Sequence, residues 1–96
     1  MNHLEEKLSE HWKKLELYVP IVDRVHGGSH PEFHDVKRVF DTMSQLLKEE
    51  PSKTSLTEAF HELRVITSDY TVPNDVCESY EAVYHMLKDL DEAYQA

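Results

Sequence analysis

The sequence predicts an all-α fold: an up-down-up-down four-helix bundle in one domain that spans residues 1–96. Two observations lead to this prediction. Apolar residues recur every three or four positions in four separate stretches, which is the period of an amphipathic helix. Breaks marked mainly by Gly or Pro separate these stretches, and loops of about three to five residues place successive helices antiparallel. The expected helices span about 2–26, 30–50, 55–69 and 74–95.

The first predicted helix, 2–26, is interrupted by Pro20, which lacks an amide donor and crowds the preceding turn. We therefore expect a kink or a break there. Gly27 or Gly28 is expected to supply a left-handed C-terminal cap. The apolar stripe of this helix, with Trp12 and Tyr18 beside it, consists of Leu4, Leu8, Leu15, Val19, Val22 and Val25.

The second predicted helix, 30–50, begins with Ser29 and Glu32 in the spacing of a capping box. Pro31 lies in the first turn, where its missing N–H costs nothing. The next position of the apolar stripe is occupied by Glu50, and Pro51 ends the helix. Its apolar members are Phe33, Val36, Phe40, Met43 and Leu47.

The third predicted helix, 55–69, opens on a second capping box formed by Ser55 and Glu58. A turn at 71–74 follows, and Asn74 or Asp75 is expected to cap the last helix, 74–95. The stripe of the third helix is Leu56, Phe60, Leu63, Ile66 or Thr67, and Tyr70. The stripe of the fourth is Val76, Tyr80, Val83, Leu87, Leu90 and Tyr94.

Composition narrows the possible locations and partners. The net charge of −9 argues against nucleic acid and against an anionic membrane, because both favour proteins rich in Lys and Arg. No apolar run approaches the roughly 18 to 20 residues of a membrane span, and no signal peptide is recognisable. A single cysteine, Cys77, fits a reducing compartment. We expect a cytoplasmic protein.

Two segments resemble turns of the hemerythrin-like domain in the di-iron proteins that repair iron–sulfur clusters. Residues 22–32 resemble the first interhelical turn of that domain, and residues 63–77, followed by Tyr80 and Tyr84, resemble its turn between the third and fourth helices. The resemblance covers about residues 15–90 and implies the same four-helix bundle. It also implies that the two turns lie at the bundle end opposite the irons.

In that family, two irons are held by His and Glu side chains near the start of helices one and three and near the end of helices two and four. Imidazole and carboxylate groups suit iron, and i, i+4 spacing places a pair on one inward face. By register with the family, the helix-two histidine falls on Glu50 and its glutamate partner near Thr54, with Pro51 between them. Residues 53–55 hold no counterpart of the family's glutamate–histidine pair.

The other ligand positions are also substituted. The helix-four histidine would fall just beyond Ala96, and the helix-one histidine near Leu4 or Glu5. His3 is one or two residues away, and each residue rotates a side chain by about 100° around the helix. We therefore expect no bound cofactor, and the alternative is a di-iron centre completed by ligands at other positions or from a second chain.

The remaining candidate ligands lie at the turns, where the two connections bring Asp69 to the same end as His26, His30, His34, Asp75 and Cys77. Such a set has the donor types that bind zinc or another transition metal. Capping and surface roles explain the histidines as well. Cys77 is either reactive at a helix start or packed and inert. We favour the structural roles and predict no metal site.

Two classes of function remain. We favour a non-catalytic binding or interaction module whose partner is an unidentified protein or a second copy of the chain. The alternative is a di-iron or other metal protein of iron–sulfur cluster repair or of the response to nitrosative or oxidative stress. No enzyme is predicted, because no Ser/His/Asp spacing, phosphate loop or paired-carboxylate site is present.

Overall fold

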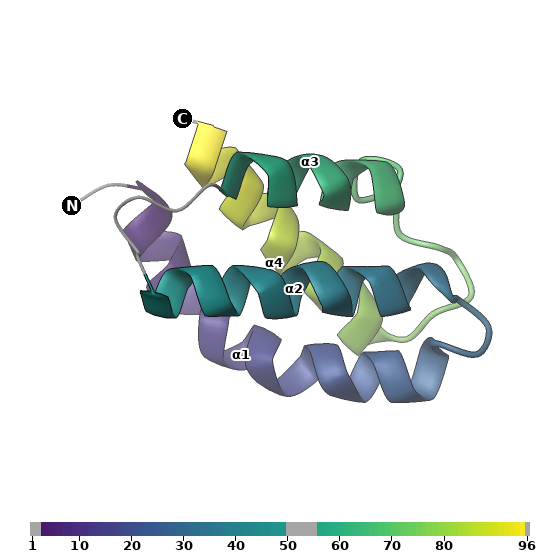
Figure 1. Cartoon of the computed structure of the whole chain (residues 1–96). Coiled ribbons are helices and arrows are strands. Elements are labelled where there is room, and N and C mark those ends of the chain that lie inside the picture. Colours follow the sequence, from purple (N-terminus) through teal and green to yellow (C-terminus); the bar gives the residue numbers. More distant parts are fainter. Residues whose placement is uncertain (1–2, 50–55, 96) are drawn as a thin grey trace.

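The computed structural model describes residues 3–49 and 56–95, which form four helices and no strand. These are α1 (His3–His26), α2 (Glu32–Glu49), α3 (Leu56–Ile66) and α4 (Glu78–Gln95). Helix α1 packs against α2 and α4, and α2 packs against α3. Successive helices run in opposite directions, and both chain ends lie at the same end of the molecule (Figure 1). The predicted all-α four-helix bundle is confirmed.

The predicted apolar stripes meet in one core. Trp12 of α1 stacks on Phe40 of α2 with ring centroids 4.6 Å apart, which joins the first two helices at mid-length. Val25 departs from its predicted place because it is 64% exposed. Among predicted stripe residues, the fully or nearly fully buried ones are Leu15, Val19, Val22, Phe33, Val36, Phe40, Met43, Leu56, Phe60, Leu63, Thr67, Tyr70, Tyr80, Val83, Leu87 and Leu90.

Helix α1 is continuous through Pro20. Its ribbon changes direction partway along (Figure 1). Proline at this position removes the N–H that would bond to the carbonyl of Glu16, so the helix bends without ending. The predicted break at Pro20 therefore does not occur.

The α1–α2 turn is built differently from the prediction. Neither glycine has a positive φ, so the predicted left-handed cap at Gly27 or Gly28 is wrong. The chain instead tightens into a right-handed turn, in which the N–H of Gly27 donates to Asp23 O at 2.9 Å and that of His30 donates to His26 O at 2.8 Å. A Cβ on Gly27 would clash with the Asp23 carbonyl and the His34 ring, whereas Gly28 faces open space.

Helix α2 begins at Glu32, two residues later than predicted. The Glu32 carboxylate faces His30 rather than closing the predicted capping box with Ser29. The first turn is held instead by backbone bonds, from Phe33 N–H to His30 O at 2.9 Å and from His34 N–H to Pro31 O at 3.0 Å. The predicted stop at Pro51 and the second capping box at Ser55 lie outside the described residues.

Helix α3 ends at Ile66, three residues before the predicted end. The reason is a run of left-handed backbone at Ser68, Asp69 and Tyr70, whose φ angles are 52°, 61° and 62°. Three such residues cannot continue a right-handed helix. The hydroxyl of Thr67 stabilises the reversal, because it donates to Leu63 O at 2.6 Å and accepts from Tyr70 N–H at 2.7 Å.

Helix α4 begins at Glu78, later than predicted, and residues 67–77 make a longer connection than expected. The carbonyl of Cys77 accepts the N–H of Glu81 at 3.2 Å, so Cys77 occupies the place predicted for Asn74 or Asp75. Among the residues that the structure describes, no helix has an apolar stretch long enough to cross a membrane.

Candidate functional site

Two connections that are far apart in the sequence meet at one end of the bundle (Figure 1). The α1–α2 turn supplies His26 and His30, and the α3–α4 connection supplies Asp75 and Cys77. Four of the candidate residues predicted from the sequence are therefore brought together. We call them, with Glu32, the turn cluster: His26, His30, Glu32, Asp75 and Cys77.

His30 links the two connections. Its Nδ1 lies 3.0 Å from Glu32 Oε2, and its Nε2 lies 2.9 Å from Asp75 Oδ1. The hydrogen bond to Glu32 has the largest effect and raises the pKa of His30; desolvation opposes it, and Asp75 raises the pKa further. With a carboxylate at each ring nitrogen, the imidazolium form donates both of its protons. His30 thus acts as a charged clamp between the turns.

His26 and Cys77 form the second pair of the cluster. His26 Nε2 lies 3.1 Å from Cys77 Sγ, and the His26 ring meets the Tyr80 ring edge-on at a centroid distance of 5.6 Å. Cys77 is exposed, which corrects the expectation that its side chain packs in the interior. Its thiol lies directly before the first turn of α4.

The other two predicted ligands lie apart from this cluster. His34 Nδ1 pairs with Asp23 Oδ1 at 2.6 Å, on the α1–α2 side of the turn. Asp69 lines a groove between α3 and α4. Each of the three candidate histidines therefore already has a partner within the chain. His26 contacts a thiol, and His30 and His34 contact carboxylates. Within residues 3–49 and 56–95, no group of three or more His, Cys, Asp or Glu side chains is placed to hold a metal ion.

Beneath the turn cluster lies a pair of buried tyrosines. The hydroxyls of Tyr80 and Tyr84 are 3.0 Å apart, and that of Tyr80 reaches Glu32 Oε2 at 3.5 Å. Burial is the main cause that raises the pKa of both hydroxyls, so they stay protonated and can donate. The ring of Phe33 packs against both tyrosines. The sequence predicted Phe33 and Tyr80 as members of the apolar stripes, but not the polar link to Glu32.

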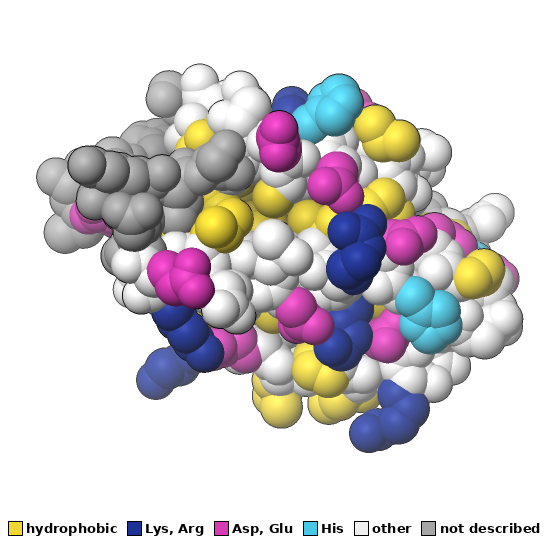
Figure 2. All heavy atoms as spheres, in the orientation of Figure 1, with side chains coloured by type: hydrophobic (Ala, Val, Ile, Leu, Met, Phe, Trp, Pro, Cys, Tyr) yellow, Lys and Arg dark blue, Asp and Glu magenta, His cyan; other side chains and the backbone are white. Residues whose placement is uncertain are grey.

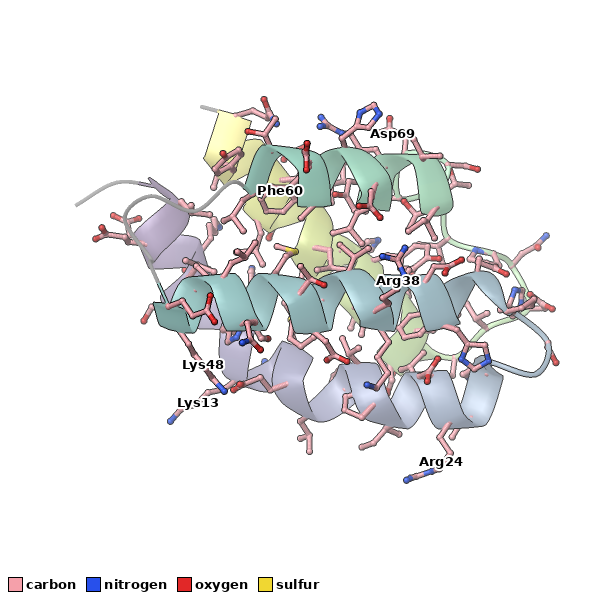
Figure 3. All side chains as sticks on the ribbon, viewed as in Figure 1. Lys13, Arg24, Arg38, Lys48, Phe60 and Asp69 are labelled. Atoms are coloured by element: carbon pink, nitrogen blue, oxygen red, sulfur yellow. The ribbon has the colours of Figure 1, made fainter. Side chains whose placement is uncertain are left out.

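The opposite end of the bundle holds apolar side chains. There, α1 and α3 begin and α2 and α4 end (Figure 1). Leu56, Phe60 and Leu90 are fully buried, and Leu8 and Leu47 pack partly buried against the same core. Figure 3 shows Phe60 directed from α3 toward the interior.

Leu56, Phe60 and Leu90 supply no donor atom to iron. The positions that the resemblance assigns to ligands at Glu50 and at 53–55 lie outside the described residues. Near the start of α1, Leu4 is half-buried against the core and Glu5 is exposed. Neither position carries the imidazole that the family has there.

One buried charge was missed by sequence reasoning. Asp91 lies outside the predicted apolar stripe of the last helix, yet the residue is only 4% exposed. It accepts a hydrogen bond from Tyr70 Oη at 2.8 Å and lies 3.6 Å from Arg64 Nε. The available sequence signal for this burial was that Asp91 directly follows Leu90, which belongs to the apolar stripe. The left-handed run after α3 turns Tyr70 inward to meet it.

Comparison with known proteins found a distant relative. The chain is 25% identical over 118 aligned residues to the iron–sulfur cluster repair protein ScdA from Staphylococcus haemolyticus (strain JCSC1435). The alignment covers 90% of this chain but 53% of that protein, so the chain spans about half of the length of its relative. The two proteins are distantly related.

The alignment with the repair protein is longer than this 96-residue chain, so the relative holds segments that have no counterpart here. No protein-family model matches the chain. No solved structure matches it either.

Proposed function

We propose that this chain is a non-catalytic binding module built on the four-helix scaffold of an iron–sulfur cluster repair protein, without the di-iron centre. The distant relationship to ScdA supports the scaffold. The observation that carries the proposal is the apolar end of the bundle, where Leu56, Phe60 and Leu90 are fully buried. In the family this end would hold inward-facing histidines and carboxylates.

The chemistry of the two ends supports the same proposal. Burying each of these large apolar side chains contributes about 1.5–3 kcal/mol to stability, so the end closes without a metal. At the turn cluster, the ring nitrogens of His30 are held by two carboxylates of the chain itself. Groups that satisfy one another support a rigid turn rather than an open coordination site. We therefore assign the binding function to the exposed surface of the helices and not to either end of the bundle.

The proposal also covers the cellular location of the protein and the class of its partner. A single exposed thiol, Cys77, suits a reducing cytoplasm, where it stays unpaired. The partner is a protein that docks on the exposed helices. Self-association is the competing possibility, and sedimentation of the purified chain separates the two.

Iron analysis tests this proposal. The full chain is produced in medium with added iron and purified without chelator, and its iron content and near-ultraviolet spectrum are measured. We expect no stoichiometric iron and no oxo-bridge absorption. About two irons per chain with that absorption would overturn the proposal and support a role in cluster repair. The His26→Ala/Cys77→Ser variant is the control, since iron that disappears in it was held at the turn cluster.

A further inference from the structure

The outward face of α1 carries an apolar stripe that no helix of the bundle covers. Leu17, Ile21 and Val25 are 59%, 39% and 64% exposed, and their i, i+4, i+8 spacing aligns them along one side of the helix. Of the large hydrophobic side chains exposed in the described residues, the one outside this stripe is Val65 on α3. Aligned exposed hydrophobics of this kind mark interaction surfaces.

Basic side chains flank this stripe. Lys14 precedes Leu17 by three positions and Arg24 follows Ile21 by three, so both are its neighbours on the helix surface, as is Lys13. Figure 3 shows Lys13 and Arg24 projecting from α1 away from the bundle, and in Figure 2 basic and hydrophobic side chains gather along that edge.

Three basic side chains beside the stripe lie outside the ion pairs of the described residues, as Lys48 and Lys88 do elsewhere. In the part of the chain that the structure describes, the basic residues in ion pairs with carboxylates are Lys7, Lys37, Arg38 and Arg64. Lys13, Lys14 and Arg24 are in none of those pairs. A chain with a net charge of −9 has many acids with which to pair them. The unpaired positive charges beside the stripe are therefore available to an acidic partner.

We propose that this face docks an acidic amphipathic helix of a partner protein. We call the face the α1 strip: Lys13, Lys14, Leu17, Ile21, Arg24 and Val25. The inference rests on the proposed function, since it assigns the surface and the partner class of the binding module. The apolar stripe is one side chain wide and about 12 Å long, which matches the apolar face of a second helix. Asp and Glu beside that face would pair with the basic flanks.

Charge favours a helix over the other occupants. An anionic bilayer is a broad surface that would also approach the acidic residues outside the strip, whereas a single helix contacts the strip alone. A second copy docked strip to strip would bring two sets of basic side chains into one interface, which opposes a symmetric dimer.

The test is an NMR titration of the isotopically labelled full chain with two synthetic helical peptides. Both have leucines at i, i+4, i+8 spacing, and they differ in carrying Glu or Lys at the flanking positions. We expect the Glu peptide to shift the amide signals of the α1 strip in a saturable manner. It should bind at least about tenfold more tightly than the Lys peptide, and its affinity should fall with added salt.

Variants locate the contact. Leu17→Ser/Val25→Ser should weaken Glu-peptide binding at least about tenfold. Val65→Ser, which changes a side chain of similar exposure on α3, should leave it unchanged. Lys13→Glu/Arg24→Glu should reverse the preference between the two peptides. Circular dichroism of each variant confirms that the bundle is intact.

The inference is overturned if both peptides bind equally, if neither shifts the strip, or if Val65→Ser weakens binding as much as the strip variant. Binding to phosphatidylserine vesicles in place of the peptide would assign the strip to a membrane. Dimerisation lost in Leu17→Ser/Val25→Ser would assign it to self-association. These results are independent of the iron assay, because a chain that loads two irons and still binds the Glu peptide refutes the proposed function and keeps the docking surface.

Discussion

At the scale of single residues, the two adjacent glycines of the α1–α2 turn have different roles. Because neither has a positive φ, backbone freedom does not explain them. Gly27 is required by the close approach of the His34 ring and the Asp23 carbonyl, while Gly28 faces open space. The sequence marks both as turn glycines, and only packing separates them.

Substitution of each glycine by alanine tests this difference. Gly27→Ala should lower the free energy of unfolding by about 1–3 kcal/mol, since a backbone atom lies in the way of the new methyl group. Gly28→Ala should be neutral or raise it by up to about 1 kcal/mol by restricting the unfolded chain. Urea unfolding of the two variants checks this, and equal effects would show that the turn is not packed as described.

The His30 clamp predicts a pH dependence. Glu32 and Asp75 raise the pKa of His30 in the folded chain, so its stabilising contribution is full below the unfolded pKa of about 6.5. The contribution is lost as the pH rises through the higher folded pKa. The unfolding free energy that His30→Gln removes should therefore be larger at about pH 5.5 than at about pH 8.5.

The matched control for the clamp is His85→Gln, which removes an exposed histidine of α4 that makes neither carboxylate contact. Urea unfolding at several pH values measures both variants. A His30→Gln effect that is constant with pH, or that His85→Gln reproduces, would contradict the assignment of the clamp.

At the scale of elements, the stripes were predictable and the ends were less so. Three- and four-residue periodicity located all four helices, and α1 ends at its predicted residue, His26. The end of α3 and the start of α4 were missed because the left-handed run at 68–70 contains no glycine. Nothing in the identities of Ser68, Asp69 and Tyr70 signals three such residues in succession.

The α3 end provides a test at the element scale. Ser68→Gly should raise the free energy of unfolding by about 0.5–1 kcal/mol, because glycine relieves a left-handed φ of 52° that costs serine about 1–2 kcal/mol. The Ser68 carbonyl still accepts the bond from Thr71 after the change. Ser29→Gly, in the first turn and without a positive φ, should instead destabilise slightly. If both variants lose stability in thermal unfolding, the left-handed run is not as described.

At the scale of the whole molecule, the sequence predicted the bundle, the distant relatives and the end at which the turns meet. It did not predict how the turn residues pair. Whether His30 faces Asp75 depends on the course of residues 67–77, which periodicity does not determine. Asp91 was missed for the same reason, since its partner Tyr70 reaches it from that connection. Polar pairing across a fold depends on the loops, whereas apolar periodicity depends on the helices.

The stability of the whole bundle should depend on the apolar end and not on metal. Leu90 is fully buried near the end of α4, so Leu90→Ala should cost about 2–5 kcal/mol through lost burial and the cavity left behind. A metal bound to the folded state alone would add stability that grows with its concentration. We therefore expect the same unfolding free energies for the parent chain and for Leu90→Ala in excess chelator and in anaerobic ferrous iron. A midpoint that rises with iron in the parent chain would mean that this end binds metal and that the apolar side chains do not close it.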